Sequence, residues 1–306
     1  MRLLQSELLR AASRRLVPMV MIGGLIGIVV GLGIAAVNAD KPSPSAIARA
    51  QIGYEQDVAR CEQTFTGPQV PAGFDSVTQY CEENQPPGID GFLLRDLGAI
   101  LQGIATFVIL LGVILGASLG GADWTNNTMQ TLLTWEPRRV RVFLVRALVI
   151  AVCVFVVTVL LQVVFAGVDA LVASTRGTTA FLPTSFWRTV FLTIGRVSLV
   201  TTGLALIAYA VAMIGRSTVA SLGALFGYLI LFEGVIAGFR PTIQGNLLVR
   251  AAIVVITHRP ILDPTRFGEG ASDVLMGVSR AWTVLGVYIV LLSMLAVTIF
   301  RRRDVT

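Results

Sequence analysis

The residue types that support catalysis or metal binding are scarce in this sequence. Its 306 residues contain a single histidine, His258, and three cysteines, Cys61, Cys81 and Cys153. One histidine excludes a two-histidine metalloprotease and a histidine-rich metal cage. The only lysine, Lys41, has no glycine-rich loop before it, so the chain lacks a P-loop for nucleotide phosphates. We therefore expect no catalytic residue, no metal site and no cofactor bound by this chain, and we expect His258 to be a solvated or hydrogen-bonded loop residue.

Two pairs of residues could instead form bonds that stabilise the fold. Cys61 and Cys81 flank a loop containing Pro and Gly in a segment that we expect on the oxidising side of a membrane. This arrangement favours a disulfide, with two free thiols as the alternative. Arg196 and Glu233 each interrupt an apolar run, roughly 13 Å and roughly 9 Å from the expected outer ends of their helices. Because an isolated charge inside a membrane is costly, we expect both to face the protein interior, where they either pair or line a substrate pathway.

The composition places these residues in an integral membrane protein. Hydrophobic residues make up 55% of the chain and charged residues 14%, against about 25% charged in a typical soluble domain. A soluble particle could not cover its surface with so few charges. The net charge is +6, but the arginines are not gathered in a soluble basic domain, so we expect no nucleic-acid partner.

Six segments are apolar over the length of about 20 residues that a bilayer span requires. They predict an all-α membrane protein with six transmembrane helices at Leu16–Val37, Leu97–Ala122, Ala147–Val168, Trp187–Gly215, Ser217–Phe239 and Ala281–Phe300. The domains are then residues 1–37 with the first helix, 38–96 outside the membrane, and 97–306 with the other five helices. The first apolar run, 22 residues long, exceeds the core of roughly 7–15 residues in a cleavable signal peptide, so we expect it to remain as an anchor.

The distribution of arginines predicts the orientation of these helices. Six crossings place both termini on one side, and the short segments on that side have more than twice the density of basic residues of the segments opposite. Basic residues concentrate in cytoplasmic loops. We therefore expect a multi-pass protein of the cell membrane with both termini in the cytoplasm.

Two outer segments have recognisable patterns. In residues 38–96, Ser43 or Ser45 could cap a helix that runs to about Phe65. Residues 240–280 are too polar to span a bilayer, but the mostly apolar stretch Asn246–Ile256 has the length of a re-entrant or interfacial helix.

Glycines recur at four-residue spacing in the first two spans, and such faces let helices approach closely in a membrane. The glycine faces favour packing of the helices within the subunit, with dimerisation as the alternative. The glycines are Gly23, Gly27, Gly31, Gly112, Gly116 and Gly120.

Residues 121–141, between the second and third spans, predict a short cytoplasmic helix with large apolar side chains. Asp123 or Thr125 could cap its start, and Pro137 discourages its continuation beyond Trp135. Large apolar residues outside a membrane indicate either the lipid interface or a protein partner, and the pattern alone leaves both open. The candidate contact residues are Asp123, Trp124, Thr128, Met129, Leu132, Leu133, Trp135, Glu136, Pro137, Arg138 and Arg139.

The run from Asp123 to Arg146 resembles the cytoplasmic coupling segment of permeases in the ABC type-2 exporter family. The matching residues are an acidic residue, a Thr-Leu-like pair, two leucines and a Pro followed by basic residues: Asp123, Thr128-Met129, Leu132-Leu133, Pro137, Arg138-Arg139 and Arg146. Asn127 stands where a glycine is common, and Met129 where leucine is usual. The stretch from Glu7 to Arg15 is similar to the family's amphipathic elbow helix, and the resemblance extends over essentially the whole chain.

The resemblance implies a permease subunit that pairs with a second copy or a paralogue and with two separate ATP-binding cassette ATPase subunits, which would bind ATP and Mg²⁺. The short helix would insert into a groove on the ATPase, with Trp124, Leu132 and Trp135 as anchors. Arg138 and Arg139 would orient it, although simple anchoring at the membrane surface is the alternative. The outer element from about Pro241 to His258 would gate the exit. The subunit itself would not be an enzyme, and its cargo would be small or amphipathic.

The sequence is also compatible with two other classes of function, although less well. An ion-coupled carrier or channel would act without an ATPase and would use Arg196 and Glu233 as its coupling charges. An intramembrane enzyme would lack catalytic side chains, because the lone histidine is expected in an outer loop and no carboxylate pair lies within the predicted spans.

Overall fold

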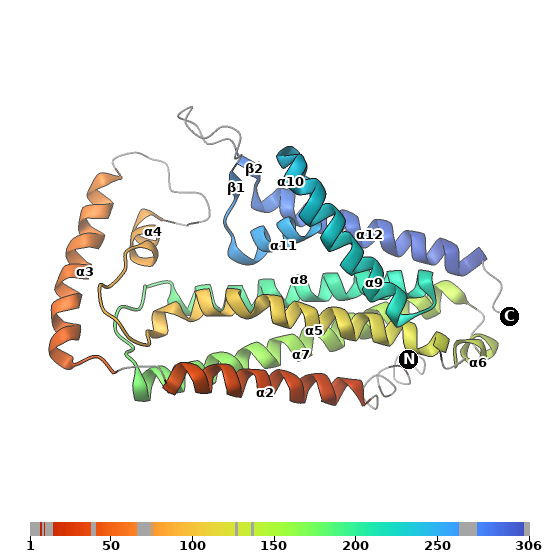
Figure 1. Ribbon diagram of the computed structural model, residues 1–306, viewed down its shortest axis with the longest axis horizontal. Coiled ribbons are helices and arrows are strands. Elements are labelled where there is room, and N and C mark those ends of the chain that lie inside the picture. Colours follow the sequence, from red (N-terminus) through yellow and green to blue (C-terminus); the bar gives the residue numbers. More distant parts are fainter. Residues whose placement is uncertain are drawn as a thin grey trace. The chain divides into compact units, whose positions relative to one another are not determined.

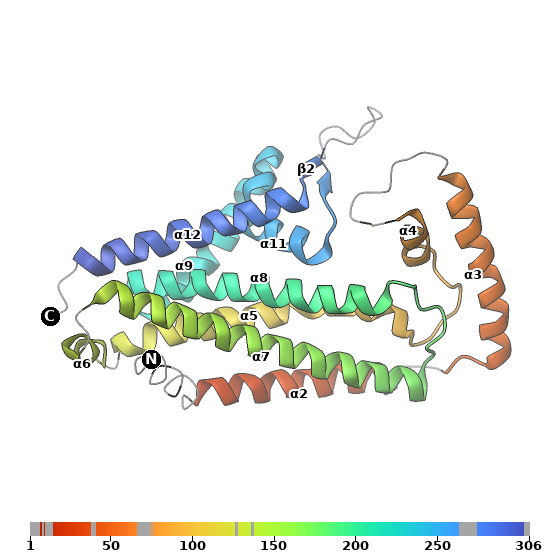
Figure 2. The ribbon, with the colours of Figure 1, turned by 180° about the vertical axis from the view of Figure 1, so that it is seen from behind.

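A computed structural model describes residues 7, 9, 15–37, 41–65, 74, 76–125, 128–135, 138–262 and 274–302 (Figures 1 and 2). Helices make up most of this part of the chain. The elements are α2 (Leu16–Val37), α3 (Pro44–Thr64), α4 (Val77–Asn84), η1 (Leu94–Asp96), α5 (Leu97–Thr125), α6 (Thr128–Trp135), α7 (Arg139–Arg176), α8 (Phe186–Gly215), α9 (Thr218–Tyr228), η2 (Leu229–Ile236), α10 (Ala237–Phe239), η3 (Pro241–Asn246), α11 (Leu248–Thr257), β1 (Ile261–Leu262), β2 (Val274–Met276) and α12 (Val278–Arg302).

Five helical stretches in the described residues are long and apolar enough to cross a membrane. They are Leu94–Thr125, Arg139–Arg176, Phe186–Gly215, Thr218–Phe239 and Val278–Arg302, and they contain the second to sixth predicted spans almost completely. The prediction of an all-α membrane protein is confirmed to this extent. The first predicted span forms α2, but the apolar stretch counted within it, Val17–Gly33, is shorter than the other five, so its crossing stays a prediction.

Helix α7 extends beyond the third predicted span at both ends. The span was expected to end at Val168, but α7 is 38 residues long and continues to Arg176. Hydrogen bonding between backbone groups does not end where the apolar run ends, so a helix can extend beyond its membrane-spanning part. Asp169, the residue directly after the predicted span, therefore lies on the same helix.

The chain divides into two compact units. The first comprises Met1–Gly24, Ala105–Leu160 and Arg196–Thr306, and the second comprises Leu25–Ile104 and Leu161–Gly195. Helices α5, α7 and α8 therefore contribute residues to both units.

The second unit contains α3 and α4. Each helix begins after a serine N-cap, and Ser43 is one of the two residues predicted to cap α3. The Ser43 hydroxyl accepts a hydrogen bond from the Ala46 amide at 3.3 Å, and α3 ends at Thr64. Ser76 caps α4 in the same way, through the Gln79 amide at 3.1 Å. These caps satisfy amide groups that have no partner within the helix.

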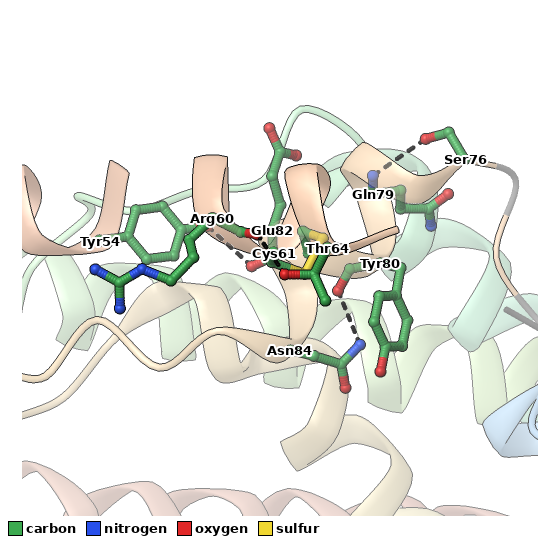
Figure 3. The surroundings of a disulfide bond; sticks show 10 residues. Tyr54, Arg60, Cys61, Thr64, Ser76, Gln79, Tyr80, Glu82 and Asn84 are labelled. Atoms are coloured by element: carbon green, nitrogen blue, oxygen red, sulfur yellow. Dashed lines mark hydrogen bonds between the residues drawn. A yellow bond between two sulfur atoms is a disulfide. The ribbon is translucent and has the colours of Figure 1, made fainter. Parts of the chain in front are cut away.

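A disulfide joins α3 to α4, as Figure 3 shows. Cys61 and Cys81 have their Cα atoms 5.8 Å apart, so the predicted bond is confirmed. Cys153 is a free cysteine within α7. The Tyr54 hydroxyl also donates to the Glu82 carbonyl at 2.9 Å, which adds a second connection between the two helices. Burial raises the pKa of the Tyr54 phenol, and the nearby Arg95 guanidinium partly opposes this shift.

Side chains of α4 bind the start of α8 within the same unit. The Glu82 carboxylate accepts hydrogen bonds from the Thr184 amide at 2.9 Å and from the Thr184 hydroxyl at 3.0 Å. The neighbouring Glu83 carboxylate accepts one from the Ser185 hydroxyl at 3.2 Å. Both acceptors lie next to the first residues of α8, where negative charge is favoured by the helix dipole. The disulfide-linked pair is therefore attached to a membrane-spanning helix through two carboxylates.

The core of the first unit forms around α11. Buried residues of this short helix, including Ala251, Val254 and Val255, pack with buried residues of α5, α8 and α12, and the cluster includes Val108, Val197, Val200 and Leu285. Helix α11 lies beside α12 in both views (Figures 1 and 2). The mostly apolar stretch that was predicted between the last two spans is therefore a helix, and six of its residues are buried.

One of the two glycine faces packs within the subunit as expected. A Cβ atom placed on Gly116 would collide with the backbone of Ala205 on α8, and one on Gly112 would collide with the Thr201 side chain. Glycine thus permits α5 and α8 to approach closely. On α2, a Cβ on Gly23 or Gly31 would meet nothing within 4 Å among the described residues. Packing of that second face within the subunit therefore stays a prediction.

Candidate functional site

Helix α6 is a separate element between two membrane-spanning helices. It has eight residues, begins shortly after α5 ends at Thr125, and stops at Trp135, where the sequence predicted its end. Either Asp123 or Thr125 was expected to cap it, but both lie in the last turn of α5, so that prediction is wrong. The α5 run continues because nothing in Asp123-Trp124-Thr125 stops a helix. Glu136 and Pro137 lie outside the described residues.

Three buried charged residues meet beside α6. Arg146 of α7 forms an ion pair with Asp123 of α5, and its Nε atom lies 3.3 Å from an Oε atom of Glu7. Each of the three is at most 6% exposed. We call Glu7, Asp123 and Arg146 the buried charge cluster. It brings together the N-terminal segment, the end of α5 and the start of α7.

Helix α6 is bound to this cluster by its first two residues. The Thr128 hydroxyl donates to the Asp123 carboxylate at 3.2 Å, and Arg146 lies 3.9 Å from the Met129 sulfur. Met129 is only 1% exposed. Both residues belong to the predicted coupling set, but Met129 is buried within this chain and therefore positions α6 instead of offering a contact to a partner.

Trp124 is likewise held by residues of its own chain. Its indole N–H points to the Met213 sulfur at 3.4 Å, and the Arg216 guanidinium lies over its ring, 4.9 Å from the centroid. The Phe300 ring of α12 meets it edge to face at 6.1 Å. A Trp at this position therefore connects the end of α5 to α8 and α12, and only part of it is exposed.

The outward face of α6 is polar where its side chains are described. Thr128, Thr131 and Thr134 are all exposed. Leu132, Leu133 and Trp135 belong to the helix, and their side chains lie outside the described part of the chain. Just beyond α6, Arg138 is exposed, and Arg139 donates to the Phe300 carbonyl at 3.2 Å and to the Arg301 carbonyl at 3.4 Å.

Glu233 makes contacts at the start of α11. It lies in η2, a π-helical stretch, and its carboxylate accepts hydrogen bonds from the Val249 amide at 2.6 Å and from the Tyr228 hydroxyl at 3.4 Å. It therefore caps the N terminus of α11 from another helix. The expected ion pair with Arg196 is not among the contacts described for Glu233.

His258 lies where α11 ends, with a left-handed backbone at a φ of 57°. This loop position agrees with the sequence analysis. Among the described residues, no group of three or more His, Cys, Asp and Glu side chains could hold a metal ion.

Sequence reasoning missed two features of the first and second units. The charge cluster was missed because Glu7, Asp123 and Arg146 come from three distant segments, and no spacing rule connects them. Asp169 was missed because the third span was ended one residue before it. Asp169 is fully buried, and neither carboxylate oxygen has a hydrogen-bond partner among the described residues.

No protein-family model matches the chain, and a search of curated proteins finds no significant match.

Proposed function

We propose that this chain is the membrane permease subunit of an ATP-binding cassette exporter. The observation that carries the proposal is α6, a short helix with exposed threonines between two membrane-spanning helices, attached to both by buried charges. A loop that only reversed the chain would need neither a helix nor a buried ion pair, because a few polar residues suffice for a turn.

The buried charge cluster supports a mechanical role for α6. A force on this helix would pass through Thr128 to Asp123 and Arg146, and from these to α5 and α7. Trp124 adds the connection to α8 and α12. A helix held at so many points moves its neighbours when it moves, which suits rigid-body switching between two states.

In this proposal, α6 binds a groove on a separate ATPase subunit, which binds ATP and Mg²⁺. Thr131, Thr134 and Arg138 are the exposed residues available for that contact, with Leu132, Leu133 and Trp135 on the same helix. Trp124 and Met129 act within the subunit, by holding α6 in position. The cytoplasmic orientation of α6 and the pairing with a second permease belong to the same proposal.

The test uses the full chain, tagged and purified in mild detergent from its native membrane. We expect a copurifying polypeptide with a P-loop sequence and vanadate-sensitive ATP hydrolysis by the complex. A variant with Thr131 and Thr134 replaced by arginine should lose that polypeptide while keeping the melting temperature of the subunit. The proposal is contradicted if the wild-type chain purifies without an ATPase and moves solutes in liposomes by itself.

An ion-coupled carrier is the second candidate, and Asp169 is the observation that favours it. Asp169 is buried on a helix that is long and apolar enough to cross a membrane, and its carboxylate has no hydrogen-bond partner among the described residues. Ionisable groups on such helices often mark ion and proton pathways. A carrier of this kind would transport in liposomes without any partner, and the Asp169→Asn variant would lose that transport.

A further inference from the structure

A pocket of about 420 Å³ lies where the start of α7 meets the end of α12. The residues that line it in the described part of the chain are Arg138, Arg139, Val140 and Arg301. We call it the arginine pocket. Three guanidinium groups and no carboxylate are among these residues, so the pocket has the charge and the hydrogen-bond donors for an anion.

Arg139 builds the pocket by joining its two walls. Its Nη1 atom donates to the carbonyls of Phe300 and Arg301, which lie in the last turn of α12. These carbonyls have no partner within their own helix, so an arginine is a favourable partner for them. Arg139 therefore holds the two helices of the pocket together. Arg138 and Arg301 are exposed and can bind a ligand.

The pocket lies at the boundary between basic and apolar residues on both helices. Beyond Val140, exposed apolar side chains continue along α7 at Leu144 and Leu148, and along α12 the exposed apolar side chains include Leu291 and Leu295. Exposed apolar surface on a membrane-spanning helix faces lipid acyl chains. A ligand with an anionic head and apolar chains therefore matches the pocket and the helix surfaces that adjoin it.

We propose that the arginine pocket binds the phosphate group of an anionic phospholipid. Arginine is suited to this group because its planar guanidinium donates two parallel hydrogen bonds to phosphate oxygens. Basic pockets between membrane-spanning helices commonly bind such head groups. The site does not depend on the ATPase proposal, because it is built from α7 and α12 alone.

The test measures lipid binding by native mass spectrometry of the full chain in detergent. The probes are phosphatidylglycerol, phosphatidylcholine and inorganic phosphate. We expect phosphatidylglycerol to bind more tightly than phosphatidylcholine, and the double variant R138Q/R301Q to weaken phosphatidylglycerol binding about tenfold. Arg139 is left in place because its loss would also free the α12 carbonyls.

Arg302→Gln is the matched control. It removes the same charge from the next residue of α12, which is exposed and does not line the pocket. The proposal predicts wild-type affinity for this control. Equal weakening in both variants would overturn the site, as would unchanged binding by R138Q/R301Q. If inorganic phosphate displaces phosphatidylglycerol at equal concentration, the ligand is free phosphate and the lipid assignment fails.

Discussion

Arg146 and Asp123 form an ion pair inside the protein, although they lie 23 positions apart in the sequence, with a complete short helix between them. The Glu7 carboxylate lies beside the same Arg146 guanidinium, so one buried arginine contacts two buried carboxylates. Taking charges out of water is costly, and such an arrangement persists only when each charge has its partners. The cluster therefore fixes the place of α6 relative to α5 and α7.

Replacing Arg146 by glutamine should strongly destabilise the protein. The change leaves two buried carboxylates without their counter-charge, and the expected loss is about 3–5 kcal/mol of unfolding free energy. Thermal or denaturant unfolding of the purified chain in detergent measures it.

Two further variants make this measurement specific. Arg176→Gln removes an exposed arginine from the other end of α7 and should change stability little. Adding Glu7→Gln and Asp123→Asn to the Arg146→Gln background should restore part of the loss. If the single Arg146 variant is as stable as the Arg176 variant, the cluster does not support the fold.

Gly116→Ala should destabilise the contact between α5 and α8. The new methyl group would meet the backbone of Ala205, which cannot move without shifting α8, and such overpacking typically costs about 1–3 kcal/mol. Gly103→Ala is the control on the same helix, because nothing lies within 4 Å of its added Cβ. The control should be neutral or stabilising by up to about 1 kcal/mol. The packing is refuted if the two alanines have equal effects on unfolding.

The sequence predicted those parts of the fold that local patterns determine. Apolar runs located five of the long helices, Ser43 marked the start of α3, and the loop between Cys61 and Cys81 indicated the disulfide. Apolar runs and capping residues are local patterns that can be recognised without knowing the tertiary structure.

Contacts between distant segments could not be predicted in this way. Glu233 and Arg196 were expected either to pair or to line a pathway, because their depths in neighbouring spans match. The hydrogen bond from the Val249 amide to Glu233 was not among these expectations. Which partner the Glu233 carboxylate binds depends on the direction of the η2 side chains and on the residue where α11 begins. Neither can be predicted from the spacing of residues in the sequence. Trp124 and Met129, two of the predicted coupling residues, also make contacts within the chain that no spacing rule predicts.

Glu233→Ala should loosen the start of α11. The carboxylate accepts the Val249 amide, and loss of a charged cap typically costs about 1 kcal/mol, so exchange of the α11 amides should accelerate about fivefold. Glu233→Gln keeps an acceptor and should have a smaller effect. Hydrogen–deuterium exchange of the purified chain distinguishes the two. Unchanged exchange at Val249 in the alanine variant would show that the cap contributes nothing.

The disulfide should protect α3 and α4 from proteolysis. It closes a segment with a sequence separation of 20, and a constraint of that length typically contributes about 3 kcal/mol. The double variant C61S/C81S should therefore be cleaved faster by trypsin at Arg60, which is exposed on α3. Cys153→Ser should leave this rate unchanged. Equal cleavage of the double variant and the wild type would contradict the stabilising role.

The proposed contact between α6 and an ATPase is tested most directly by photo-crosslinking in the native membrane. A photoreactive amino acid at Thr131, exposed on α6, should yield an adduct whose partner peptides include a P-loop. The same group at Ser45, exposed on α3, is the control and should give no such adduct. Adducts to lipid alone at Thr131, or the same partner at both positions, would contradict the account.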